Sequence, residues 1–173
     1  MSEDDILKLK AIVLYILQLA GGRFDKYKIL KTIYFAEKNH LHRFGCRLSN
    51  DNYMAMPHGP VSSFVDDALK NNTSRKGVSI IINAININRN EIIAKENPDM
   101  DEISSSNIDC LKKAYDDIKD LSFSNIRDLS HDLAYCKAST NGKMNIFDVM
   151  EDAGANEDSL RLLKDQMILE GKL

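Results

Sequence analysis

The chain has 173 residues, of which 43% are hydrophobic, and its formal net charge is −3. This length fits a single domain over residues 1–173, and the negative charge argues against a protein held to nucleic acid mainly by bulk positive charge. The three cysteines lie far apart and form no C-x-x-C pair, so the sequence predicts neither a common zinc site nor a disulfide framework.

The first predicted element is a helix over Ile6–Leu19, whose apolar side chains fall on nearly every face. Its apolar run, Ala11–Ala20, is too short to span a bilayer and follows an acidic start. We therefore expect a buried core helix in a cytoplasmic protein, with no membrane association. Gly21 and Gly22 end this helix, and a second one is predicted over Phe24–His42.

A short strand is predicted over Tyr53–Met56, followed by a helix over Val61–Lys70. Gly59 and Pro60 lie between them. Glycine permits a backbone conformation that is closed to other residues, and proline fixes φ where the first helical turn begins. These two residues and Val61 are therefore interpreted as the structural motif that directs the strand into the helix.

Two β-branched runs, Val78–Ile85 and Glu91–Lys95, are separated by Asn86–Asn90 and predict a β-hairpin over residues 78–95. Four helices are predicted in the remaining part, residues 104–170, with serines as N-cap candidates for the first two: Ser105–Lys119, Asn125–Ala134, Ile146–Ala153 and Asn156–Glu170. The predicted fold is mainly α with a small antiparallel β element (α+β), a compact helical domain carrying a β-hairpin.

Metal-ligand side chains occur at His40, His42, Cys46 and His58, but they do not form a predicted metal site. His40 and His42 point about 200° apart on a helix and do not share one ion. The sequence also has no G-x-S-x-G turn, P-loop or G-x-G-x-x-G motif. We expect no metal, no cofactor and no enzyme activity. The enzyme alternative would have to use His40, His58 and His131.

The helix over Phe24–His42 carries a cationic stripe. Lys28, Lys31, Lys38 and His42 fall within about 80° of one another, and Phe35 lies inside this stripe. One interpretation is that Phe35 packs under another element while the lysines are solvated. The other is an exposed aromatic ringed by cations, which suits a protein interface or contacts with nucleic acid.

The segment Lys28–Lys70 resembles the signature of the Panacea domain, the SocA-like antitoxin family. The signature region as a whole is taken as residues 24–70. A later segment, DLSHDLAYCKA (Asp128–Ala138), is similar to the family's Leu-(Ser/Thr)-His segment, although Tyr135 stands where the family usually has Trp. The matching residues of the first segment are Lys28, Ile29, Lys31, Tyr34, Phe35, Ala36, His40, Leu41, Gly45, Tyr53, Ala55, Gly59, Pro60 and Val61.

The resemblance implies a bacterial antitoxin that neutralises a cognate toxin, encoded beside it, by direct protein contact. One branch of the family delivers its toxin to an ATP-dependent protease, and related proteins also occur in prophages. No catalytic residues come with the family. The partner-contact hypothesis places Lys31, Phe35 and Lys38 on the helix beside Tyr53 and His58 on the adjoining turn. Two alternatives stay open: a winged-helix DNA-binding regulator, with nucleic acid disfavoured by charge, and a phage-associated protein that binds a host factor.

Overall fold

The computed structural model describes residues 1–172, which form a mainly helical α+β fold, as predicted. It contains two small antiparallel sheets, whereas the sequence predicts one β-hairpin. The sheets have the strand orders β1-β5-β4 and β2-β3. The elements in chain order are α1 (Glu3–Leu19), β1 (Arg23–Asp25), α2 (Lys26–Phe44), β2 (Tyr53–Met56), β3 (Gly59–Ser62), α3 (Ser63–Leu69), α4 (Ser79–Ile82), β4 (Ile85–Asn88), β5 (Glu91–Ala94), α5 (Ser105–Ile118), α6 (Phe123–Ser130), α7 (Leu133–Lys137), α8 (Ile146–Asp152) and α9 (Glu157–Leu169).

Helix α1 is the buried core helix that its apolar run predicts. Ser2 caps it through a capping box, in which the Ser2 N–H donates to Asp5 Oδ2 (2.9 Å) and the Asp5 N–H donates to Ser2 Oγ (3.1 Å). Leu9, Ala11 and Ile12 point to different sides of the helix, and all three are fully buried. Among the described residues, no helix combines the length and apolarity that crossing a membrane requires.

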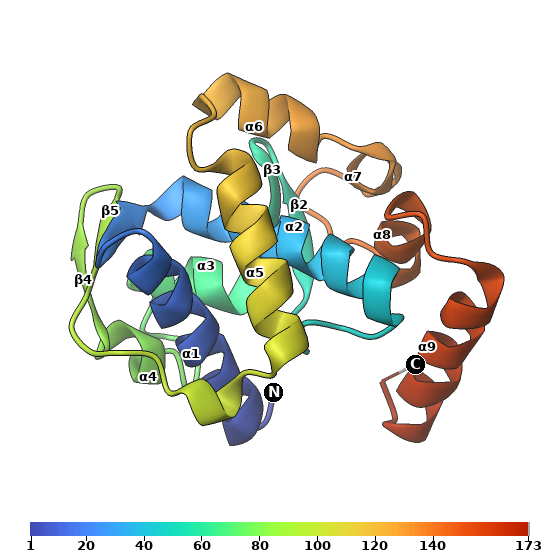
Figure 1. Cartoon of the computed structure of the whole chain (residues 1–173), viewed down its shortest axis with the longest axis horizontal. Helices are drawn as coiled ribbons and strands as arrows, with labels where there is room; N and C mark the ends of the chain where they lie inside the picture. Colours follow the sequence, from blue (N-terminus) through green and yellow to red (C-terminus); the bar gives the residue numbers. More distant parts are fainter. Residues whose placement is uncertain (173) are drawn as a thin grey trace.

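Helix α2 lies at the centre of the molecule, where α5 crosses it (Figure 1) and β3 packs against it. It begins two residues later than predicted, at Lys26 and not at Phe24. Phe24 is in β1, where it pairs with Ile92, and the Asp25 carboxylate accepts the Lys28 N–H as the N-cap. Ten of its 19 residues are buried, because α2 packs against both α5 and β3.

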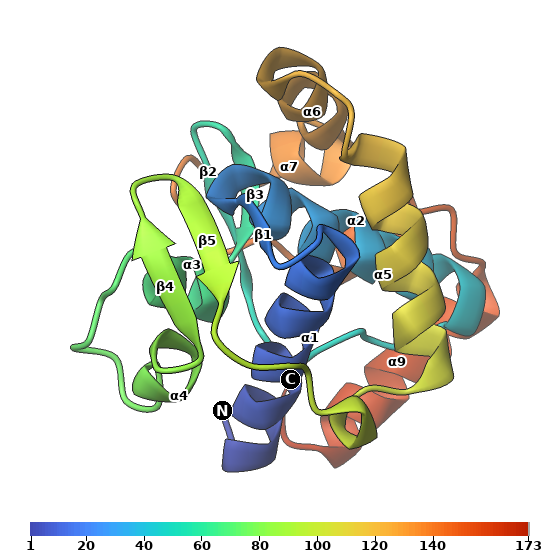
Figure 2. The ribbon, with the colours of Figure 1, turned by 60° about the vertical axis from the view of Figure 1, so that its left-hand side comes forward.

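The hairpin predicted over residues 78–95 exists, but it is shorter. Its strands are β4 and β5, joined at Arg89 and Asn90, and β5 lies between β4 and β1 (Figure 2). The first part of the β-branched run forms the short helix α4 instead. Val78 and Ile81 are both fully buried there, and α4 packs against α1 and α3. Tertiary packing therefore overrides the local strand preference of these residues.

The segment around Gly59 and Pro60 also differs from the prediction. Gly59, Pro60 and Val61 are not the start of a helix but belong to β3, which pairs with β2, and Pro60 lies opposite Ala55. Proline is tolerated because β3 is an edge strand. Helix α3 begins only at Ser63, where the Phe64 N–H donates to the buried Asp51 carboxylate at 2.8 Å.

The C-terminal helices follow the predicted order, with Ser104 and Ser122 as N-caps. The helix predicted over Asn125–Ala134 is two helices. α6 ends at Ser130, and the Asp132 side chain caps α7 by accepting the Tyr135 N–H at 2.9 Å. Helix α9 lies at the opposite end of the molecule from β4 and β5 (Figure 1).

Candidate functional site

The turn between β2 and β3 is the point where the two separately recognised sequence segments meet. Gly59 has a φ of +97°, and a Cβ at this position would lie 2.3 Å from Ser130 Oγ and 2.8 Å from Lys31 Nζ. Glycine is therefore required both by the backbone conformation and by the close approach of α6 and α2. On the same turn, Tyr135 donates its hydroxyl hydrogen to the Met56 carbonyl oxygen at 2.9 Å.

Lys31 is fully buried beneath this turn. Its Nζ donates to the Pro60 carbonyl oxygen at 2.6 Å and lies 5.1 Å from the centre of the Tyr27 ring. Within residues 1–172, no carboxylate forms an ion pair with it. Burial lowers the pKa of Lys31 to about 7, and the more distant carboxylates of Asp66 and Asp132 oppose this only in part.

Lys38 and Tyr34 connect α2 to the C-terminal helices. Lys38 Nζ pairs with Asp132 at 2.7 Å and also with Asp152, and the Tyr34 hydroxyl donates to Asp132 at 2.8 Å. Burial and the neighbouring Asp132 carboxylate raise the pKa of Tyr34 far above its ordinary value. Both charges of the Lys38–Asp132 pair are thus engaged inside the protein, where they join α2 to α7.

Tyr53 belongs to an internal network around Glu37, which has no exposed surface. The Tyr53 hydroxyl donates to Glu37 Oε2 at 3.2 Å, and Arg47 Nε donates to Glu37 Oε1 at the same distance. Arg47 Nη2 donates to the backbone carbonyl oxygen of Asp51. The Asp51 carboxylate in turn accepts a hydrogen bond from the Ser62 hydroxyl. The network holds β2 and β3 against α2.

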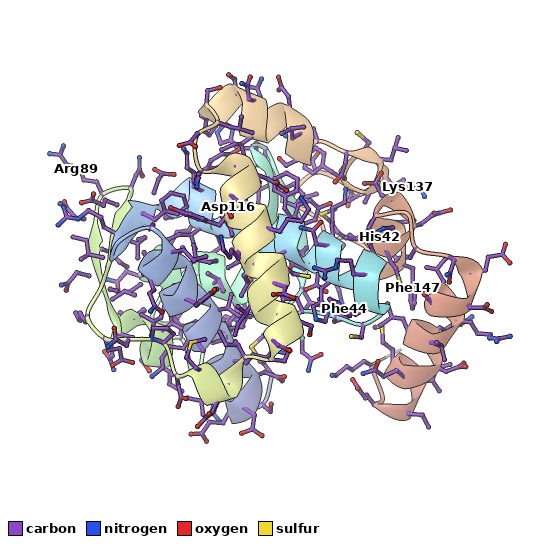
Figure 3. The ribbon with its side chains drawn as sticks, in the orientation of Figure 1. His42, Phe44, Arg89, Asp116, Lys137 and Phe147 are labelled. Atoms are coloured by element: carbon purple, nitrogen blue, oxygen red, sulfur yellow. The ribbon has the colours of Figure 1, made fainter. Side chains whose placement is uncertain are left out.

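His40 is also used internally. Its Nδ1 lies 2.8 Å from the Cys46 carbonyl oxygen, and its Nε2 lies 3.0 Å from Ser106 Oγ and 3.1 Å from Asn107 Nδ2. These contacts join the end of α2 to the start of α5, while His42 and Phe44 lie exposed near that end of α2 (Figure 3). The described part of the chain holds no group of three or more His, Cys, Asp or Glu side chains arranged to bind a metal.

A cavity of about 620 Å³ opens on the outer side of the turn, between the first half of α2, the β2–β3 hairpin and α6. Its walls are mainly apolar and include Tyr27, Leu30, Met56, Val61 and Phe123. Further hollows are lined by polar side chains between α9 and the rest of the molecule. The cavity at the turn differs from these because it combines apolar walls with lysines at its edge.

The structure separates the five residues of the partner-contact hypothesis. Lys31 and Tyr53 are buried, and Phe35 and Lys38 are half-buried, so α2 does not present an exposed aromatic ringed by cations. His58 is exposed. Lys31 and His58 line the same cavity, together with Gly59 and Val61, whereas Phe35, Lys38 and Tyr53 lie outside it.

Sequence reasoning missed Tyr27 and Phe123 as neighbours of His58. Phe123 lies 4.4 Å from Tyr27 and 5.3 Å from His58 between ring centres, and 47% of its surface is exposed. It comes from α6, far along the chain, and no local pattern pairs it with the turn.

A family description matches residues 29–135, which is more than half of the chain and runs from α2 to α7: "Antitoxin SocA-like, Panacea domain". The chain belongs to this SocA-like antitoxin family. No curated protein and no solved structure matches it significantly. The matched range contains the Gly59 turn, Lys31, Ser130 and Asp132, so the SocA-like region includes both segments that meet at the turn.

Proposed function

We propose that this SocA-like protein neutralises a toxin encoded beside its own gene by binding that toxin directly. The observation that carries the proposal is the family match over α2 to α7. Neutralisation by binding needs only a complementary surface of about 800 Å² on each partner. We place this surface at the turn and α6, where His58 and Phe123 are exposed within the part of the chain that matches the family.

We further propose that the protein is not an enzyme and that it acts in the cytoplasm. Support comes from the way the family region uses its polar side chains. Lys38, Tyr34 and Asp132 bind one another, and His40 bonds to the start of α5. These groups join structural elements and are not free to act on a substrate.

The proposal is tested by co-expression. The adjoining gene is induced alone and then together with this protein, and growth is measured in both cases. Arrested growth that recovers on co-expression is the expected result, and purified proteins should then form a complex in gel filtration. An adjoining product that does not affect growth, or one that stays toxic, overturns the proposal, and affinity capture from lysate would then test the host-factor alternative.

Sequestration and delivery to a protease predict different behaviour of the toxin. In a host that lacks its ATP-dependent proteases, sequestration still rescues growth and the toxin stays at an undiminished level in a complex. Delivery fails to rescue growth in that host. In a normal host, delivery lowers the steady-state level of the toxin, which immunoblotting of a tagged toxin measures.

A further inference from the structure

The cavity beside the β2–β3 turn has the composition of a receptor for an apolar side chain. Leu30 and Val61 are almost fully buried in it, while Met56 and Tyr27 are half-buried at its sides. Phe123, on its edge, lies against the Tyr27 and His58 rings with almost half of its surface exposed. Partly exposed aromatic side chains at the edge of an apolar pocket are typical anchors of protein interfaces.

The charges around the cavity are opposite in sign to the charge of the whole chain. Four lysines and two aspartates line it, whereas the chain has a net charge of −3. Lys70 pairs with Asp66 at 2.6 Å. Lys28 donates to a backbone carbonyl oxygen, which does not cancel its charge, and Lys26 forms no ion pair within residues 1–172. Lys31, whose pKa is about 7, carries only part of its charge at neutral pH. The cavity edge is therefore an electropositive region on an acidic protein.

The two properties together define one occupant. We propose that the cavity receives an aromatic or aliphatic side chain of the partner, from a segment that carries carboxylates on both sides of that side chain. The inference deepens the proposed function because it assigns the toxin contact to this site. Binding of this side chain removes apolar surface of the cavity from water, which is favourable. The flanking carboxylates are attracted to the ammonium groups of Lys26 and Lys28 at the edge.

The chemistry of the cavity is tested first without any toxin. The ¹⁵N-labelled protein is titrated with a terminally blocked Glu-Asp-Phe-Asp-Glu peptide, and backbone amide shifts are followed by NMR. We expect saturable shifts confined to the segments that line the cavity, which are residues 25–31, 56–61, 66, 70, 90 and 123. The inference is overturned if the peptide causes no saturable shifts, or if its shifts lie elsewhere on the surface. It is also overturned if Lys-Lys-Phe-Lys-Lys causes equal shifts, or if a thymidine octanucleotide binds more strongly than the acidic peptide.

Two variants alter the cavity without removing a core contact, and each has a matched control. Lys26→Glu reverses an edge charge at the first position of α2, where an acidic residue stabilises the helix. Its control is Lys112→Glu on α5, where Lys112 is exposed and pairs with Asp116; Asp116 is labelled in Figure 3. Phe123→Ala removes the edge aromatic, and its control is Leu162→Ala on α9, where Leu162 is 64% exposed.

The same variants are then tested against the product of the adjoining gene. We expect Lys26→Glu and Phe123→Ala each to weaken toxin binding at least tenfold in calorimetry, whereas the two controls bind like wild type. If wild type neutralises the toxin and the cavity variants bind it equally well, the inference is overturned and the proposed function stands. If wild type does not bind the toxin but the acidic peptide occupies the cavity, the proposed function is overturned and the cavity chemistry stands.

Discussion

Replacement of Lys31 by methionine should make the protein more stable at neutral pH, because Lys31 is buried without an ion-pair partner. Its pKa is about 7 in the folded protein against 10.5 for an exposed lysine. Below pH 7 both the folded and the unfolded chain carry the proton, so the whole cost of burying the ammonium group is present. Between about pH 7 and 10.5 the unfolded chain binds more protons than the folded one, and stability therefore rises with pH.

The size of the effect follows from the two pKa values. Each pH unit in this range corresponds to about 1.4 kcal/mol, so the cost is about 4 kcal/mol at pH 7 and about 2 kcal/mol at pH 9. Lys31→Met removes this cost but leaves the Pro60 carbonyl oxygen without its donor, a loss of about 1 kcal/mol at either pH. The variant should thus gain about 3 kcal/mol over wild type at pH 7 and about 1 kcal/mol at pH 9.

Urea unfolding of both proteins at pH 7 and pH 9, followed by far-UV circular dichroism, measures this difference. Thiols and tyrosines contribute equally to the pH dependence of unfolding in both proteins, so their contributions cancel in the difference between variant and wild type. Lys113→Met is the matched control, because Lys113 lies exposed on α5 and should show no pH-dependent difference. A Lys31→Met variant whose stability relative to wild type is the same at both pH values would refute the reasoning that the ammonium group is buried and uncompensated.

Three further substitutions test the contacts around the turn. Gly59→Ala should destabilise the protein by about 3 kcal/mol, because the added Cβ would clash with Ser130 Oγ and the backbone conformation is unfavourable for alanine. An unchanged midpoint in thermal melting would contradict this expectation. Tyr53→Phe should cost about 1.5 kcal/mol in urea unfolding by removing the hydrogen bond to Glu37, and a loss of toxin binding without any loss of stability would instead show that Tyr53 contacts the partner. Phe35→Ala should cost about 2 kcal/mol, since Phe35 is half-buried against the core, while the folded variant still binds toxin; lost binding at wild-type stability would restore Phe35 to the interface.

The sequence by itself determined the elements whose signals are local. The uniform apolar character of Ile6–Leu19 indicates a buried helix in any packing arrangement, and α1 is that helix. The serines before the first two of the later helices mark N-termini that the structure confirms. The antitoxin resemblance likewise depends on residue order along the chain, and the family match over residues 29–135 bears it out.

The tertiary structure alone decided which polar residues are accessible. A helical projection places Lys31, Phe35 and Lys38 on one face, but it does not show whether another element covers that face. In this fold β3 covers Lys31, and α7 and α8 supply the aspartates that bind Lys38. The cavity depends on the same kind of long-range contact, since Phe123 reaches the β2–β3 turn only after α6 folds back over it. Accessibility is a property of contacts between distant segments, and a pattern within one segment does not contain it.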